Sequence, residues 1–288
     1  MNKIYPPKVY LNGDILAPDE AKISVFDRGF LFGDGIYEVM AQIGGQFLYQ
    51  EAHIDRLQEG LQKIKIDFDV RLLDTEIPKL LDAAELHGKD CLLYIQITRG
   101  VAPRKHAYPN QITPTILMYA TAQTLPDIND VLAQVVSMND FRWSRCDIKM
   151  TSLLGNVMAN EYGAQKGCYE TVLFREGLVT EASHSNVFFV RDRVVYTHPE
   201  NEYILSGITR KIVLELCAQL GIKVMEEAIA IEEVVKMDEA FLTGTNTQIA
   251  SIKQWDDHFF YHGDTIEGVT KELQWAFKEL KERNSTLK

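Results

Sequence analysis

The segment FRWSRCDIKMTSLLGN, residues 141–156, joins a predicted strand to a predicted helix at the start of the second half of the chain. The apolar run VLAQVVSM (131–138) before it is typical of a strand, and TSLLGNVMANEYGAQKG (151–167) after it is typical of a helix. Lys149 lies at this junction, where we expect the end of the strand to present it. A partly desolvated lysine can attack a carbonyl as a neutral amine, although a lysine considered alone is more often a surface charge.

Turn and cap residues mark the ends of several predicted elements. Thr151 or Ser152 is expected to cap the helix that follows the junction, and Gly167 to end it. An earlier helix is expected to begin near Thr75, with Pro78 in its first turn and Gly88 as its stop. Hairpin turns are expected at Asn12-Gly13 and Gly44-Gly45.

Strands and helices alternate along the whole chain. The predicted helices cover residues 51–64, 75–88, 151–167, 207–221 and 270–283. The predicted strands cover residues 8–11, 14–17, 37–43, 46–50, 91–100, 114–122, 131–138, 169–174, 185–190, 193–197, 239–244, 248–252 and 257–261. This order predicts an α/β or α+β protein with a small N-terminal α/β domain (1–120), a linker (121–131) and a large C-terminal α/β domain (132–288).

Composition excludes several classes of function. The chain has 288 residues, of which 46% are hydrophobic and 25% charged, and its net charge of −11 gives no electrostatic support for binding nucleic acid or an anionic membrane. Its four cysteines are scattered, with no CxxC pair and no metal-ligand spacing, so we expect reduced thiols and no metal. No apolar run approaches the length of a membrane span. We therefore expect a soluble, cytoplasmic protein.

Two short segments have the composition of anion-binding turns. GITR (207–210) opens a predicted helix with free backbone N–H groups and a threonine hydroxyl, which suits a phosphate. LTGTNT (242–247) offers a second group of hydroxyls and amides. Taken alone, GITR is more often an ordinary helix start, and LTGTNT is also compatible with a simple tight turn.

Several single side chains have both a chemical and a structural interpretation. Arg56 lies at the edge of the apolar face of its helix, so it is either solvated or able to reach an anion. Glu181 follows a predicted strand and is either a surface carboxylate or the partner of a cationic heterocycle. Arg104 and His106, in the loop APRKHAYP, are either solvated or an anion trap, and Tyr37 is either a core residue or a ligand contact.

Taken together, these segments resemble the fold-type IV pyridoxal-phosphate-dependent aminotransferases, and within them the enzymes that act on D-amino acids such as D-alanine. The resemblance extends over almost the whole chain, and its order and spacing make it specific. The segments that carry it are FDRGFLFGDGIYEV, HIDRL, QITRGVAPRKHAYP, RWSRCDIKMTSLLGN, KGCYETVL, LVTEASHSNVFFV, YTHPENEYILSGITR and KMDEAFLTGT.

The resemblance implies a pyridoxal 5′-phosphate cofactor at the domain interface and a role for each candidate residue. Lys149 would form the internal aldimine and shuttle the substrate proton, in ping-pong transfer of an amino group between D-amino acids and 2-oxo acids such as 2-oxoglutarate or pyruvate. Glu181 would pair with the pyridine nitrogen. The residues implied at the phosphate are Arg56, Ile208, Thr209 and Thr245, and Arg142 is implied near the ring.

The same resemblance implies the substrate contacts and the assembly. Tyr37 would orient the substrate, while Arg104 and His106 would bind its carboxylate from the neighbouring subunit of a homodimer. Three residues depart from the D-specific pattern and place the preferred side chain in question: His184, Asn246 and Gln248. The alternatives on this fold are a branched-chain L-aminotransferase, an (R)-amine transaminase and, third, an aminodeoxychorismate lyase. A non-catalytic binding module is disfavoured, because such a module needs no Schiff-base lysine.

Overall fold

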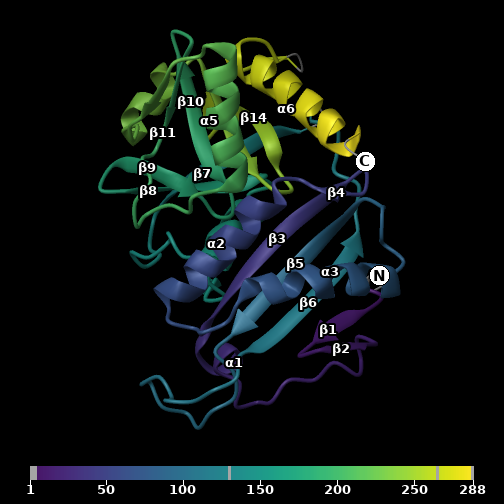
Figure 1. Ribbon diagram of the computed structural model, residues 1–288. Helices are drawn as coiled ribbons and strands as arrows, with labels where there is room; N and C mark the ends of the chain where they lie inside the picture. The colour runs from purple at the N-terminus through teal and green to yellow at the C-terminus, as the bar shows by residue number, and fades with distance from the viewer. Residues whose placement is uncertain (1–4, 129–130, 264–265, 287–288) are drawn as a thin grey trace. The chain divides into compact units, whose positions relative to one another are not determined.

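The computed structural model describes residues 5–128, 131–263 and 266–286, which divide into two compact units (Figure 1). The first unit is Met1–Leu125 with Ile148–Ser152 and Asn284–Lys288, and the second is Pro126–Asp147 with Leu153–Arg283. The short segment Ile148–Ser152, which holds Lys149, thus groups with the first unit. The boundaries expected from the sequence stay a prediction, and residues 129–130 of the expected linker lie outside the described residues.

The first unit is built on a six-stranded antiparallel sheet in the order β2-β1-β6-β5-β3-β4. Its strands are β1 (Val9–Leu11), β2 (Asp14–Leu16), β3 (Gly35–Ile43), β4 (Gln46–Phe47), β5 (Cys91–Thr98) and β6 (Thr115–Ala122). Asn12 and Gly13 both have positive φ, at 53° and 107°. Such a two-residue turn matches the twist of the strands, so the predicted first hairpin is confirmed.

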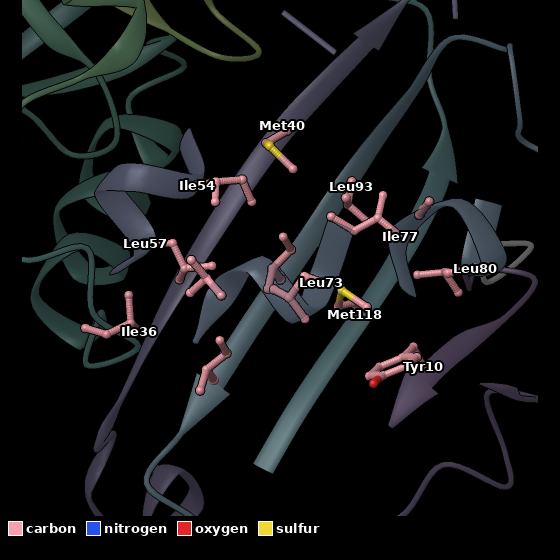
Figure 2. Packing of buried hydrophobic residues seen from close by; sticks show 14 of the residues in the cluster. Tyr10, Ile36, Met40, Ile54, Leu57, Leu73, Ile77, Leu80, Leu93 and Met118 are labelled. Carbon is pink, nitrogen blue, oxygen red and sulfur yellow. The ribbon is translucent and has the colours of Figure 1, made fainter. Parts of the chain in front are cut away.

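Two helices cover one face of this sheet, α2 (Gln50–Lys63) and α3 (Leu73–Ala83). A one-turn 3₁₀ helix (Val70–Leu72) precedes α3, and a short helix α1 (Arg28–Phe32) precedes β3. Figure 2 shows the apolar core between these helices and the sheet; its labelled side chains are Tyr10, Ile36, Met40, Ile54, Leu57, Leu73, Ile77, Leu80, Leu93 and Met118. The predicted apolar face of α2 is buried at Ile54, Leu57 and Leu61, whereas Ile64 follows the helix and is only partly buried.

The opposite face of the sheet carries a row of stacked tyrosines. Tyr37 of β3 stacks on Tyr94 of β5 with ring centroids 5.8 Å apart, and Tyr94 stacks on Tyr119 of β6 at 4.9 Å. Successive residues of a strand point to opposite faces. Tyr37 and Glu38, adjacent in β3, therefore lie on different sides of the sheet.

The second unit is built on a nine-stranded mixed sheet in the order β12-β11-β10-β13-β14-β7-β8-β9, with β15 paired to β14. Its strands are β7 (Leu132–Asn139), β8 (Glu170–Arg175), β9 (Leu178–Ala182), β10 (Asn186–Arg191), β11 (Val194–Thr197), β12 (Val224–Glu226), β13 (Glu239–Gly244), β14 (Gln248–Trp255) and β15 (His258–Phe259). Its helices are α4 (Leu154–Gln165), α5 (Ile208–Leu220) and α6 (Val269–Thr286), with a 3₁₀ segment at Ile231–Lys236. The predicted mixed α and β architecture is confirmed.

Two helix boundaries differ from the sequence expectation. The helix expected over 75–88 begins at Leu73 and ends at Ala83, because Glu85 takes a left-handed φ of 58° and turns the chain. Pro78 therefore lies in the second turn of α3 rather than the first. The expected caps of α4, Thr151 and Ser152, do not cap that helix: their hydroxyls donate to the Gly33 carbonyl at 2.9 and 3.0 Å.

Among the described residues, no helix is long and apolar enough to cross a membrane. The same part of the chain holds no group of three or more His, Cys, Asp or Glu side chains that could bind a metal ion. All four cysteines are free thiols.

Candidate active site

Lys149 lies in a loop of the first unit and is held there by β3. The expectation that a strand end presents it was wrong, because β7 ends at Asn139 and the chain then crosses ten irregular residues. Met150 instead forms an isolated antiparallel bridge with Ile36, and the Tyr37 amide donates to the Lys149 carbonyl at 3.0 Å. These backbone contacts fix the lysine beside the strand.

The amine of Lys149 points at Tyr37. Its Nζ donates to the Tyr37 hydroxyl at 3.3 Å and lies 4.4 Å from the centre of the tyrosine ring. Both side chains are half-buried. The structure therefore brings together two of the residues that the sequence predicts, a nucleophilic amine and a tyrosine that can orient it.

Arg56 is part of a buried charge cluster on the other side of β3. Its Nε and Nη2 donate to the two carboxylate oxygens of Glu38 at 2.9 and 2.6 Å, and His53 Nδ1 lies 3.0 Å from Glu38 Oε1. Burial alone would raise the pKa of Glu38, but Arg56 and His53 hold it far below its usual range. Burial lowers the pKa of His53. Glu38 is thus ionised and fixes the orientation of the Arg56 guanidinium.

Replacing Glu38 with glutamine should lower the free energy of unfolding by roughly 3–5 kcal/mol, because Arg56 would keep its charge in a mostly buried position without the carboxylate. Urea unfolding of the cofactor-free protein measures the loss. The matched control is Glu51→Gln on the helix of Arg56, which breaks an exposed ion pair with Arg71 and should cost much less stability. Equal losses in the two variants would contradict the assignment.

Glu181 lies in the second unit, inside β9 rather than after a strand. It is buried, and it accepts hydrogen bonds from Arg142 Nη1 at 2.7 Å, Asn186 Nδ2 at 3.1 Å and the Leu205 amide at 3.0 Å. Burial raises the pKa of Glu181, and the guanidinium of Arg142 only partly offsets this effect. An ionised carboxylate has about four acceptor positions. Three donors therefore leave room for one more, which suits a protonated ring nitrogen.

Arg142 is occupied on both sides by carboxylates. Besides Glu181 it binds Asp140, through Nε and Nη2 at 3.0 Å each, and donates to the Tyr203 carbonyl at 3.3 Å. Burial would lower the pKa of Arg142, but Glu181 and Asp140 raise it well above its usual range. Arg142 is thus an ionic support for Glu181, and its predicted position near a cofactor ring stays a prediction.

The start of α5 has the geometry of an anion site. The helix begins at Ile208 after Gly207, and no side chain caps it, so the amides of its first turn are not used by a side-chain acceptor. A side chain at Gly207 would not fit, because a Cβ there would lie 2.1 Å from Asn186 Oδ1. Ile208 and Thr209 are buried. Thr245 lies half-buried in the turn between β13 and β14.

Arg104 and His106 lie in the loop between β5 and β6 of the first unit, and both are exposed. Their side chains meet at Phe32: the Arg104 guanidinium lies 5.1 Å from the centre of the phenylalanine ring, and the His106 ring centre lies 5.5 Å from it. The loop therefore has a defined conformation within its own chain.

Three residues that depart from the expected pattern have different environments. His184 is half-exposed and its Nδ1 lies 2.7 Å from Glu170 Oε2. Gln248 is buried, donates to the Pro126 carbonyl at 2.9 Å and binds Lys281, so it serves the packing of its own unit. Asn246 is exposed at the tip of the turn before β14.

Sequence reasoning missed the residues that hold the predicted ones in place, chiefly Glu38, His53 and Asn186. A signal for the first was present, since Glu38 is a lone charge within the apolar run GIYEVMAQI. A charge in a buried strand needs a partner, and the following helix offers His53 and Arg56 as basic candidates. No comparable signal marked Asn186, whose role depends on the packing of β10 against Gly207.

Comparison with known proteins identifies the family. Residues 35–255 match the family model for amino-transferase class IV, and the chain belongs to this family. It is 38% identical over 277 residues to a D-alanine aminotransferase of Bacillus licheniformis, covering 94% of this chain and 96% of that one. It is 35% identical over 282 residues to a D-alanine aminotransferase of Staphylococcus aureus strain N315, covering 96% and 99%.

Solved structures agree on the fold. The branched-chain amino acid aminotransferase of Escherichia coli superposes with a TM-score of 0.88 at 19% identity, covering 96% of this chain and 94% of that one. This likeness concerns the fold alone. Class IV aminotransferases depend on pyridoxal 5′-phosphate, and the chain is accordingly a pyridoxal-phosphate-dependent aminotransferase. Its residues fit the cofactor: Lys149 offers an amine, Glu181 a further acceptor position and α5 a free N-terminus.

Proposed function

We propose that the protein transfers amino groups between D-amino acids of the D-alanine type and 2-oxo acids such as 2-oxoglutarate or pyruvate. The observation that carries this proposal is its relationship, at 38% identity over nearly the full chain, to a protein named D-alanine aminotransferase. The arrangement of Arg104 and His106 on one exposed loop supports it, because a guanidinium binds a carboxylate through two parallel hydrogen bonds.

We propose that the two clusters of polar residues bind different parts of the same cofactor. In the first unit, Lys149 holds the cofactor covalently and Arg56 binds its phosphate, with the guanidinium oriented by Glu38. In the second unit, Glu181 accepts a hydrogen bond from the ring nitrogen. The remaining phosphate ligands are Ile208 and Thr209 in the first turn of α5 and the hydroxyl of Thr245 in the β13–β14 turn.

The bound cofactor supplies an electron sink that makes the Cα–H bond of the substrate acidic. Nζ of Lys149 would accept this proton and later donate it back, because a neutral amine is a base. Tyr37, 3.3 Å from this Nζ, keeps the amine oriented during the transfer. Glu181 keeps the ring nitrogen protonated, which its single remaining acceptor position permits.

The preference for one enantiomer of the substrate follows from fixing two of the substituents on its Cα atom. Lys149 fixes the direction of the Cα–H bond, and Arg104 with His106 fixes the direction of the carboxylate. An amino acid of the opposite hand cannot satisfy both with its amino group in the same place. Loss of the charged hydrogen bonds to the carboxylate costs roughly 1.5–3 kcal/mol.

The enzyme with D-alanine and 2-oxoglutarate should exceed the rate with L-alanine by about 10²-fold in kcat/KM, which corresponds to the loss of that carboxylate contact. Coupled assays that follow pyruvate release measure both rates. L-Leucine and (R)-1-phenylethylamine belong in the same panel, since faster turnover of either would favour a branched-chain L-aminotransferase or an (R)-amine transaminase. Transfer from L-amino acids alone would refute the proposal.

We further propose a cytoplasmic homodimer in which the Arg104 and His106 loop serves the neighbouring subunit. The exposure of both side chains supports this arrangement, because a carboxylate-binding pair needs a site that it can reach. Four free thiols support a reducing compartment. Equilibrium sedimentation tests the assembly, and mixing Arg104→Ala subunits with Lys149→Ala subunits tests the shared site: only mixed dimers with a shared site would regain activity.

A further inference from the structure

A platform inside the first unit holds the loop of Arg104 and His106. Its centre is Phe32, the last residue of α1, whose ring is approached by Arg28 at 4.8 Å as well as by Arg104 and His106. A guanidinium within about 6 Å of an aromatic ring is attracted to its face. The two exposed side chains of the loop thus share one aromatic partner.

Arg28 donates hydrogen bonds to the backbone of the same loop. Its Nη1 donates to the Lys105 carbonyl at 2.5 Å and its Nη2 to the His106 carbonyl at 3.4 Å, while its Nε binds Asp34 at 2.7 Å. The side chain is almost fully buried. A buried guanidinium needs all its donors matched, so Arg28 has little freedom to move away from the loop.

Asp34 extends the platform to the end of β5. It binds Arg99 through two hydrogen bonds, 2.8 Å from Nε and 3.0 Å from Nη2. Arg99 in turn donates to the carbonyls of Ile64 and Lys65, which follow the last residue of α2. Its guanidinium lies 3.5 Å from the centre of the Tyr108 ring. The loop is therefore held on both sides of His106, at Lys105 by Arg28 and at Tyr108 by Arg99.

We infer that Phe32 and Arg28 are positioning residues that hold Arg104 and His106 in one conformation and thereby set the affinity for the substrate carboxylate. The inference rests on the proposed function, in which these two side chains bind that carboxylate. Pre-ordering matters because each long side chain that becomes fixed on binding weakens the affinity by its lost freedom. Neither Phe32 nor Arg28 touches the reacting atoms in this scheme.

The first test is Phe32→Leu, which removes the ring from a half-buried position but keeps an apolar side chain. KM for D-alanine should rise about tenfold while kcat stays within about threefold, as expected when only binding is weakened. Backbone amides of residues 101–114 should exchange with deuterium about tenfold faster in the cofactor-free full chain, since the loop loses an anchor. The matched control is Phe30→Leu on the same helix, where the ring is 68% exposed; it should change neither value.

A second variant and a double mutant keep the inference testable should Phe32→Leu fail to fold. Arg28→Lys retains the charge for Asp34 but loses the fork that reaches both carbonyls, so it should give the same pattern. In an Arg104→Ala background, Phe32→Leu should change KM by less than about twofold, because the two residues act together.

The outcomes separate this inference from the proposed function. Absence of D-alanine turnover in the unaltered enzyme refutes the function, whereas the exchange of residues 101–114 still decides whether Phe32 holds the loop. Unchanged exchange in both Phe32→Leu and Arg28→Lys overturns the inference. So does an undiminished effect of Phe32→Leu on KM when Arg104 is already alanine.

Discussion

The Lys149→Ala variant should lose transamination by more than about 10⁴-fold, since in the proposed mechanism this one side chain supplies both the covalent link and the proton transfer. The visible absorbance of the covalently held cofactor should disappear as well. The side chain that Nζ contacts is Tyr37, which accepts a hydrogen bond from the amine through its hydroxyl at 3.3 Å and has no amine of its own.

Two controls make the Lys149 result specific. Lys79→Ala removes an exposed lysine of the same unit, paired with Glu76 on the surface, and should leave the rate unchanged. Added methylamine should restore part of the activity of Lys149→Ala, because a small amine can enter the space left by the side chain and accept the proton. Turnover within tenfold of the unaltered enzyme would show that another residue moves the proton.

Replacing Glu181 with glutamine should lower kcat by about 10²–10³-fold, the size found when one preorganised electrostatic partner is removed from a site. A neutral amide cannot stabilise a protonated ring nitrogen as a carboxylate does. Stopped-flow measurement of the half-reaction with D-alanine isolates this step from substrate exchange.

The matched control for Glu181 is Asp140→Asn. Both carboxylates bind Arg142, so each variant breaks one of the two buried ion pairs of this guanidinium, and the two should lose similar stability. Only the first removes the proposed partner of the ring nitrogen. A comparable loss of kcat in the two variants would assign the effect to Arg142 and the local packing instead.

The parts of the fold that the sequence predicted well are those with a local signal. Asn12-Gly13 specifies its hairpin through positive φ, and the apolar spacing of α5 together with Gly221 at φ 68° defines that helix. The strand β9 was missed because its turn is Glu176-Gly177, in which a glutamate takes the left-handed conformation that asparagine or aspartate usually supplies. α1 was missed because five residues show no periodicity.

The candidate residues were found by pattern, but their supports are non-local. Lys149 is held in place by the bridge between its neighbour Met150 and Ile36, more than a hundred positions earlier, and no local rule predicts such a contact. The orientation of Arg56 depends on Glu38, and the clearance beside Gly207 depends on Asn186. The order of residue types along the sequence was thus enough to propose a chemical role for each. The positions of their side chains depend on contacts between distant parts of the chain, which only the folded structure shows.

Because Tyr37 and Glu38 are adjacent in β3 and point to opposite faces, this one strand positions both Lys149 and Arg56. Tyr37 meets the amine of Lys149 on one face, while Glu38 meets Arg56 on the other. A single residue inserted just before them would send both side chains to the wrong faces at once. A change of length within this part of β3 would therefore break both contacts together, whereas a change in a turn or loop outside the strand would leave their spacing intact.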